Sequence, residues 1–254
     1  MYRHDIGDTH IIITGKKDSM PLICLHGGNS NTPDMLKSNL PLQNHFSIYS
    51  IDIVGHPGKS AEGQLSSKDL SYGHWLFDVV EEFGFKKVNI YAGSFGVGIV
   101  IRLATVAPER INKLFLAIPS GLVTGSIKDQ SKIMIPYIRY RIKSTCQNLI
   151  KMSSLIMTRF DEERIELLQA LFKHVRINTK MPRPAKKEEL ESFLAPTVII
   201  ASKNDILFAA SKVIPRAKEI FTNLVYTEIL EGIHEPTEEE YKIIHQKAIE
   251  FFLS

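Results

Sequence analysis

The chain has 254 residues, of which 44% are hydrophobic and 23% charged, and its formal net charge is +3. This composition is typical of a globular protein, and so small a charge gives no reason to expect nucleic acid as a partner. No run approaches the roughly 20 apolar residues that a membrane span needs. The first residues, Met1 to Asp5, lead into no apolar segment, so we expect no signal peptide.

The two cysteines indicate no disulfide framework and no metal site. Cys24 lies in an apolar run, where we expect it to be a small core residue, and Cys146 stands far from it in the sequence. We therefore expect a reduced, cytoplasmic setting, and no metal or organic cofactor.

Short apolar runs of strand length recur along the chain. Most are apolar at consecutive positions, which is typical of strands buried on both faces of a parallel sheet. Amphipathic segments separate them, and this alternation predicts a doubly wound, mostly parallel α/β sheet. The expected strands are 11–14, 22–25, 47–51, 88–92, 114–118, 197–201 and 224–230.

The helical segments between these runs have recognisable ends. Thr32 precedes a proline and an aspartate, which predicts a helix that starts with a capping hydroxyl. A second helix is expected over 67–83, with Gly84 as its C-terminal cap. A last helix over 238–252 closes the chain.

Residues 121–184 break the alternation because they contain no strand-like run. Their patterns predict helices over 129–142, 145–158 and 161–175, followed by a stretch broken by prolines. We interpret the region as a helical insertion at the C-terminal edge of the sheet. The expected domains are therefore a core of 1–120 and 185–254, and a lid of 121–184.

A strand, a sharp turn and a helix are predicted around Ala92-Gly93-Ser94-Phe95-Gly96. A serine at such a turn is lifted clear of the sheet, and the backbone turns so tightly only because the residues two positions away are small. The usual first glycine is replaced by Ala92, which adds one methyl group. Ser94 is the candidate nucleophile, although a serine that merely caps a helix produces the same local pattern.

An earlier strand runs into His26-Gly27-Gly28-Asn29. Backbone N–H groups aimed at a developing oxyanion stabilise the transition state of acyl transfer. We expect one such donor from Phe95 and the other from Gly28, with Asn29 as the second choice. His26 itself is expected to brace the loop.

The general base must be a histidine that reaches Ser94 and is oriented by a carboxylate. His234 follows the strand 224–230 and precedes the last helix, at the sheet edge where catalytic groups gather. Asp205 follows the strand 197–201 in the same way, although a lone aspartate in a loop also serves turns. The chain order of Ser94, Asp205 and His234 favours a catalytic triad.

With these motifs in place, the sequence resembles the α/β-hydrolase superfamily over essentially its whole length. The stretch 51–60 looks like the Asp-x-x-Gly…Gly-x-Ser loop of that family, 194–200 looks like its re-entry into the sheet, and Gly232-Ile233-His234 is similar to its Gly-x-His motif. The resemblance implies the α/β-hydrolase fold and serine hydrolase chemistry. A serine at position 94 argues against haloalkane dehalogenases and epoxide hydrolases, which have aspartate there.

The expected reaction is a two-step acyl transfer on a small carboxylic ester or thioester. Ser94 attacks the carbonyl while His234 takes its proton and Asp205 holds the imidazole, and water then frees the acyl group. Two alternatives stay open. One is a C–C bond hydrolase of a diketone-like acid, which would use the same triad. The other is a hydrolase-fold receptor or binding module with negligible turnover.

The helical insertion is expected to select the substrate. Residues 121–184 contain 12 Lys and Arg against 5 Asp and Glu, which form either a solvated face or a region that attracts an anionic acyl compound. Met134 and Met157 are expected to line the pocket, because flexible methionines tolerate varied acyl chains. Asn29 is the third candidate for substrate contact.

Overall fold

The computed structural model describes residues 6–125 and 127–254, so the prediction for Met1 to Asp5 lies outside the described residues. Within them, seven strands form one sheet in the order β1-β3-β2-β4-β5-β6-β7. β1 is antiparallel to β3 and every other pair is parallel, which confirms the predicted sheet. The strands are β1 Ile11–Gly15, β2 Pro21–Leu25, β3 Ser47–Ile51, β4 Val88–Gly93, β5 Ile111–Ala117, β6 Thr197–Ser202 and β7 Leu224–Leu230.

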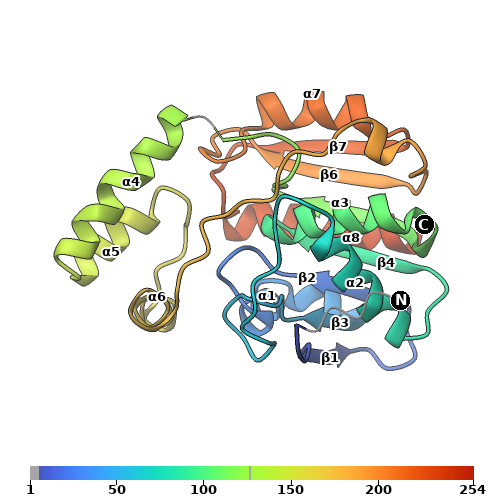
Figure 1. Cartoon of the computed structure of the whole chain (residues 1–254), viewed down its shortest axis with the longest axis horizontal. Coiled ribbons are helices and arrows are strands. Elements are labelled where there is room, and N and C mark those ends of the chain that lie inside the picture. The colour runs from blue at the N-terminus through green and yellow to red at the C-terminus, as the bar shows by residue number, and fades with distance from the viewer. Residues whose placement is uncertain (1–5, 126) are drawn as a thin grey trace.

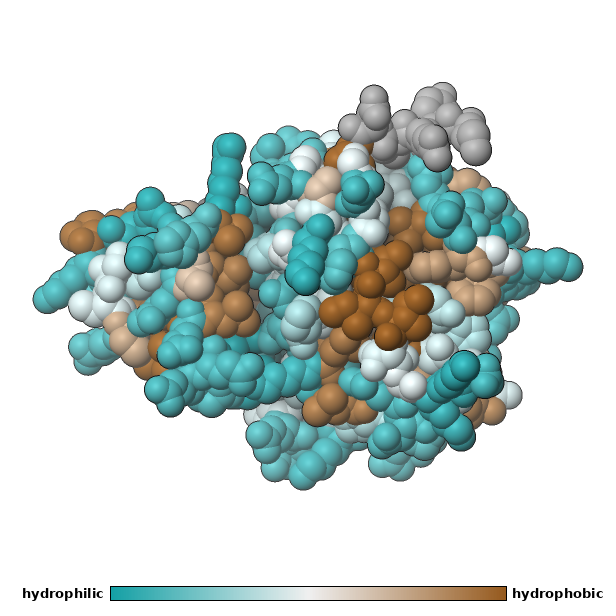
Figure 2. Space-filling model, turned by 90° about the horizontal axis from the view of Figure 1, so that it is seen from below, coloured by the Kyte–Doolittle hydropathy of each residue, from teal (hydrophilic) through white to brown (hydrophobic). Residues whose placement is uncertain are grey.

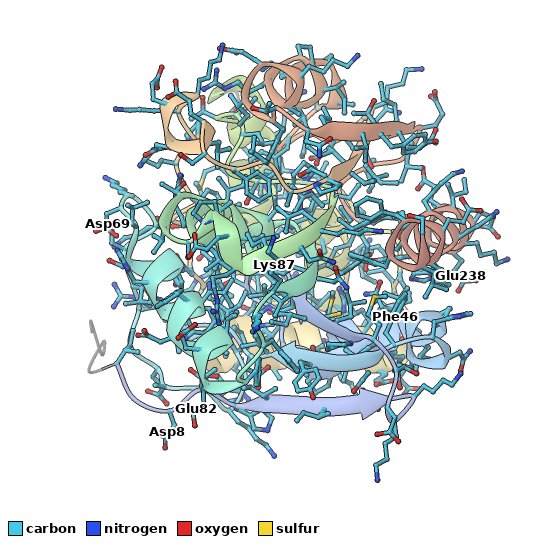
Figure 3. The ribbon with its side chains drawn as sticks, turned by 90° about the vertical axis from the view of Figure 1, so that its right-hand side faces the viewer. Asp8, Phe46, Asp69, Glu82, Lys87 and Glu238 are labelled. Atoms are coloured by element: carbon cyan, nitrogen blue, oxygen red, sulfur yellow. The ribbon has the colours of Figure 1, made fainter. Side chains whose placement is uncertain are left out.

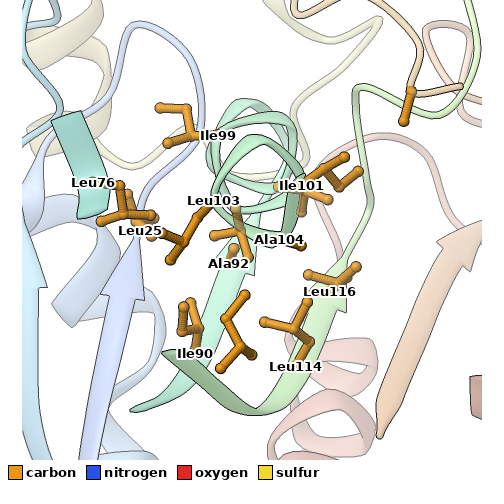
Figure 4. Close-up of a cluster of buried hydrophobic side chains, with 14 of the residues drawn as sticks. Leu25, Leu76, Ile90, Ala92, Ile99, Ile101, Leu103, Ala104, Leu114 and Leu116 are labelled. Atoms are coloured by element: carbon orange, nitrogen blue, oxygen red, sulfur yellow. The ribbon is translucent and has the colours of Figure 1, made fainter. Parts of the chain in front are cut away.

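Helices cover both faces of the sheet (Figure 1). On one face α2, α3 and α7 pack over the central strands, and Figure 4 shows Leu76 and Leu103 from two of these helices above Ile90 and Leu114. On the other face α1 buries Met35, and α8 buries Ile244, Ala248 and Phe252. Because both faces are covered, β6 is buried at every position, as its continuous apolar run predicts. These helices are α1 Thr32–Ser38, α2 Ser71–Glu82, α3 Phe95–Val106, α7 Ala210–Ile220 and α8 Glu238–Leu253, with 3-10 turns at Leu40–Asn44, Pro108–Arg110 and Glu188–Leu190.

Two predicted helix starts are wrong. The side chain that caps α1 is that of Asn31, which accepts a hydrogen bond from the Asp34 N–H at 3.0 Å, whereas Thr32 lies inside the first turn. The sequence carries two capping residues in a row, and only the backbone conformation decides between them. The second helix begins at Ser71 rather than at residue 67. Its predicted C-terminal glycine, Gly84, has a φ of +71° and is confirmed.

The insertion consists of α4 Ile127–Ile142, α5 Cys146–Ser153 and α6 Glu162–His174. All three predicted helices are present, and α5 ends five residues before the predicted residue 158. Figure 1 shows them to one side of the sheet, where they pack on each other around Leu149 and Leu168. Figure 3 looks at the opposite end of the molecule, where Lys87 lies just before β4. The insertion is therefore at the end of the molecule toward which β4 and its parallel neighbours run.

Apolar side chains also reach the surface. Figure 2, which views the molecule from below, shows apolar patches both on the insertion and on the main body. Among the exposed apolar side chains is Ile13 of the edge strand β1, which is 61% exposed. No helix in the described parts of the chain is long and apolar enough to cross a membrane.

The segment that returns from α6 to the sheet is fixed to α3 by charged groups. Arg102 of α3 is 2% exposed, donates to the carbonyl of Arg183 and lies 3.5 Å from a carboxylate oxygen of Glu189. Arg183 donates to the same oxygen at 2.9 Å. This hydrogen bond and the two guanidinium charges outweigh the effect of burial and lower the pKa of Glu189 to about 2.

A pH titration of stability tests this arrangement. In the unfolded chain the Glu189 carboxylate takes up a proton near its usual pKa of 4.5, whereas in the folded protein it stays charged down to about pH 2. Its contribution is therefore complete above that usual pKa and is lost as the pH falls toward 2. We expect the melting temperature of Glu189→Gln to fall less steeply than that of the wild type between about pH 5 and about pH 2.5. Parallel curves would contradict this assignment.

The turn between β4 and α3 brings the helix against β2 at Gly96. A methyl group at Gly96 would lie 2.8 Å from both the carbonyl oxygen of His26 and the Cβ of Leu25, while a methyl group at Gly93 would meet nothing within 4 Å. Gly96→Ala should therefore lower the free energy of unfolding by about 1–3 kcal/mol, because backbone must shift to make room. The control Gly93→Ala should stay within about 0.5 kcal/mol of the wild type. Urea unfolding of both variants measures the difference, and equal stabilities would refute it.

Candidate active site

Ser94 stands between the end of β4 and the start of α3 in a strained backbone conformation. Its φ is 46° and its ψ is −113°, a region that non-glycine residues rarely occupy. The surrounding chain holds this turn with several hydrogen bonds. The Ser94 N–H donates to the Ala117 carbonyl at 3.0 Å, and the Ser94 carbonyl accepts from the Ser120 hydroxyl at 2.8 Å. The hydroxyl of Ser94 is thereby presented at the carboxyl end of the sheet.

The structure brings the three predicted catalytic residues together. His234 Nε2 lies 2.9 Å from the Ser94 Oγ, and His234 Nδ1 lies 2.8 Å from an oxygen of Asp205. Asp205 follows β6 and His234 follows β7, so neighbouring parallel strands deliver both groups to the same edge. With Nδ1–H donating to the carboxylate, Nε2 is left to accept the serine proton.

The environment of Asp205 keeps its carboxylate charged. Its side chain is fully buried, which by itself raises the pKa, but the charge and hydrogen bond of His234 and the N–H groups of Leu207 and Phe208 outweigh this effect. The Leu207 bond is 2.7 Å long, and the net result is a pKa of Asp205 below its usual value. A fixed negative charge at this point stabilises an imidazolium at His234.

The glycine turn after β2 lies directly over the Ser94 turn. A methyl group at Gly27 would lie 3.4 Å from Ser94 Cβ, and one at Gly28 would lie 3.4 Å from Phe95 Cβ. The Asn29 N–H donates to His56 Nδ1 at 3.0 Å and is not available to a substrate. Of the two donors considered from the sequence, this leaves Gly28 to act with Phe95, and the oxyanion role of both stays a prediction.

The histidines near this turn have structural partners. His26 is 1% exposed, its Nε2 accepts from the Ile53 N–H at 3.0 Å, and its Nδ1–H donates to the Gly27 carbonyl at 2.7 Å. Burial lowers the pKa of His26, and burial, together with the neighbouring His26 imidazole, lowers the pKa of His56 to about 3. Both are therefore neutral, and His26 braces the loop as the sequence predicts.

Asn29 has a structural partner that the sequence did not indicate. Its Nδ2 donates to the Asn178 carbonyl at 2.9 Å, and its Oδ1 accepts from the Asn178 N–H at 2.7 Å. The amide therefore holds the segment that returns from the insertion beside the glycine turn. Direct contact between Asn29 and a substrate, which would compete with these bonds, stays a prediction.

The two methionines of the insertion have different surroundings. Met134 is 53% exposed on α4, beside a row of other exposed apolar side chains, Ile135, Ile138 and Ile142. Met157 packs against the small core of the insertion. The role of both in lining a substrate pocket stays a prediction.

Two residues that support this geometry, Ser120 and Asp52, were not among the site residues predicted from the sequence. Ser120 holds the Ser94 turn, and Asp52 accepts hydrogen bonds from the N–H groups of Thr32 and Lys59 and from the His10 ring. Asp52 lies in the Asp-x-x-Gly loop noted above, which is the signal that could have indicated it. Within the described ranges, no three His, Cys, Asp or Glu side chains form a group that could hold a metal ion.

Comparisons with known proteins agree with this architecture. The family described as "alpha/beta hydrolase fold" matches residues 20–130. An uncharacterized carboxylesterase, nap, of Bacillus subtilis (strain 168) is 20% identical over 97% of this chain and 83% of its own length.

Two solved structures are similar over 98% of this chain and 88% of their own chains. Naproxen esterase (carboxylesterase NP) from Bacillus subtilis has a TM-score of 0.82 at 20% identity. Carboxylesterase CesB (YbfK) from Bacillus subtilis has a TM-score of 0.77 at 19% identity. Together with the sheet order and the turn at Ser94, these likenesses show that the chain has the α/β-hydrolase fold.

Proposed function

We propose that this chain is a carboxylesterase that cleaves small-molecule esters through an acyl-enzyme intermediate on Ser94. The observation that carries the proposal is the continuous hydrogen-bonded chain from Ser94 through His234 to the buried carboxylate of Asp205. A merely structural serine at a helix start needs neither the histidine nor the aspartate. The likeness to carboxylesterases over nearly the whole chain supports the same reaction.

In the proposed first step Ser94 Oγ attacks the ester carbonyl and His234 Nε2 takes its proton. The carbonyl oxygen becomes negatively charged and receives hydrogen bonds from the N–H groups of Gly28 and Phe95. His234 then gives the proton to the departing alcohol, and the acyl group remains on Ser94. In the second step the same imidazole takes a proton from water, which attacks the acyl group and frees the acid. The residues named here supply every proton transfer.

The pairing of charged residues in the insertion indicates whether the substrate is charged. Three of its arginines are engaged with carboxylates: Arg159 with Asp161, Arg164 with Asp34, and Arg183 with Glu189. Arginines that are already paired attract an external anion weakly. This favours an uncharged ester or thioester over an anionic acyl compound, and over the diketone-like acid of a C–C bond hydrolase.

An activity panel tests the proposed reaction. We expect turnover of p-nitrophenyl acetate and butyrate and none of a vinylogous diketone acid, because Arg159, Arg164 and Arg183 are already paired with carboxylates. The measurement is release of p-nitrophenolate against loss of the diketone chromophore. Faster cleavage of the diketone would overturn the ester assignment and leave the fold intact. Absence of both activities, with no labelling by a fluorophosphonate, would indicate a binding module instead.

Substitutions test the residue roles. Ser94→Ala should abolish fluorophosphonate labelling, because it removes the nucleophile. Asp205→Asn should keep the fold but lower kcat by about 10⁴-fold, because the amide favours the wrong imidazole tautomer. Labelled protein on a gel and steady-state kinetics give the two readouts.

The matched control is Ser71→Ala. Ser71 has the same spacing to a glycine, Gly73, but begins α2. This variant should be labelled and should turn over like the wild type. Labelling that persists in Ser94→Ala would show that another residue is the nucleophile.

A further inference from the structure

One guanidinium of the insertion contacts both the loop just after His234 and the helix that follows the glycine turn. Arg164 lies in the first turn of α6 and is 9% exposed. Its Nη1 donates to an oxygen of Asp34 in α1, and its Nη2 lies 3.3 Å from an oxygen of Glu235. Two carboxylates that are far apart in the sequence therefore share one buried cation.

One of these carboxylates, that of Glu235, belongs to the loop of the proposed general base. Glu235 directly follows His234 in the sequence. Its second carboxylate oxygen accepts from the Thr158 N–H at 2.9 Å, and its own N–H donates to the Ile156 carbonyl at 2.8 Å. The chain just past His234 is thus held by the insertion through a backbone bond, a side-chain bond and the Arg164 ion pair.

The other carboxylate, that of Asp34, belongs to the helix that follows the glycine turn. Asp34 accepts from the Ser30 hydroxyl at 2.8 Å, and Ser30 stands two residues after Gly28. Asp34 also lies in the first turn of α1, whose N-terminal cap is Asn31. Arg164 is consequently linked by hydrogen bonds both to the segment that would supply an oxyanion donor and to the segment that carries the proposed base.

Among the residues that the structure describes, no neighbouring cation duplicates both contacts. Arg159 lies 3.6 Å from the same oxygen of Asp34, but its other recorded partner is Asp161. Lys37 pairs with Glu163 at the surface. Asp34 and Glu235 have side chains only 14% and 13% exposed, so without Arg164 two poorly hydrated negative charges would face each other. We expect the segments that carry Asp34 and Glu235 to move apart, because this reduces the repulsion between the two carboxylates.

We propose that Arg164 is a positioning residue. Through it, the relative position of the His234 loop and the Gly28 turn depends on the position of the insertion on the core. The proposal rests on the proposed function, since only an acyl-transfer site needs these two loops at fixed positions relative to each other. The guanidinium of Arg164 bonds Asp34 and Glu235 rather than the reacting atoms, so its effect should appear in kcat rather than in KM. A displacement of a catalytic group by about 1 Å costs up to about 100-fold in rate.

The first experiment compares Arg164→Met with Arg164→Lys. Methionine removes the charge and keeps much of the length, while lysine keeps the charge but has no planar fork to bond two carboxylates. We expect kcat for p-nitrophenyl butyrate to fall by about 10-fold to about 100-fold in Arg164→Met and by less in Arg164→Lys. The rate of fluorophosphonate labelling at Ser94 should fall in parallel, and KM should change by less than about threefold.

The second experiment is chemical rescue. A cavity of about 230 Å³ is lined by Asp34, Arg159 and Arg164, among other residues, so a small cation can reach the place of the missing side chain. Guanidinium chloride at low, non-denaturing concentration should raise kcat of Arg164→Ala severalfold and leave the wild type unchanged. Sodium chloride at equal ionic strength should have no such effect. Loss of packing alone would not be repaired by a planar cation.

The matched control is Glu163→Gln, which breaks a different ion pair between the insertion and the core, that with Lys37, and leaves Glu235 untouched. Its kcat should equal that of the wild type. Wild-type kcat and labelling rates in Arg164→Met would overturn the proposal, as would an equal loss in Glu163→Gln. If Arg164→Met does not fold, Glu235→Gln decides, because it removes the same ion pair from the other side. A wild-type protein that fails to react with the fluorophosphonate would instead refute the proposed function.

Discussion

The strained turn at Ser94 is the constraint on which the rest of the site depends. A positive φ at a serine persists only because α3 packs so closely on β2 that Gly96 has no room for a side chain, and because Ala117 and Ser120 bond the turn from the next strand. The same close packing places the glycine turn after β2 over the helix start. The nucleophile and the neighbouring N–H groups are thus positioned by one feature of the backbone.

The sheet, most of the helices and the three candidate catalytic residues follow from local patterns in the sequence. Consecutive apolar residues over 197–201 predict a strand buried on both faces, and β6 is such a strand. His234 and Asp205 could be found because parallel strands end at a common edge, so a residue just past a strand is placed by topology alone. The order of the three residues along the chain supplied the remaining information.

The contacts that hold the insertion could not be predicted in this way. The pairing of Asn29 with Asn178, and of Arg164 with Asp34 and Glu235, joins residues up to 149 positions apart through single side chains. An arginine on a helix face has the same appearance in a sequence whether it is solvated or shared between two carboxylates. The cap of α1 is a smaller case, since Asn31 and Thr32 are both good caps and the backbone chooses between them.

Two kinds of interaction therefore hold the site. The Ser94 turn is held mainly by backbone hydrogen bonds and close packing within the sheet domain, which tolerate little change. The insertion is held by a few ion pairs, one amide and single hydrogen bonds to the Glu235 segment, most of which single substitutions can alter. In the proposed enzyme, such a division would let the insertion change its substrate contacts while the reaction at Ser94 is preserved. Arg164 limits that freedom, because a substitution there would disturb both the insertion and the His234 loop.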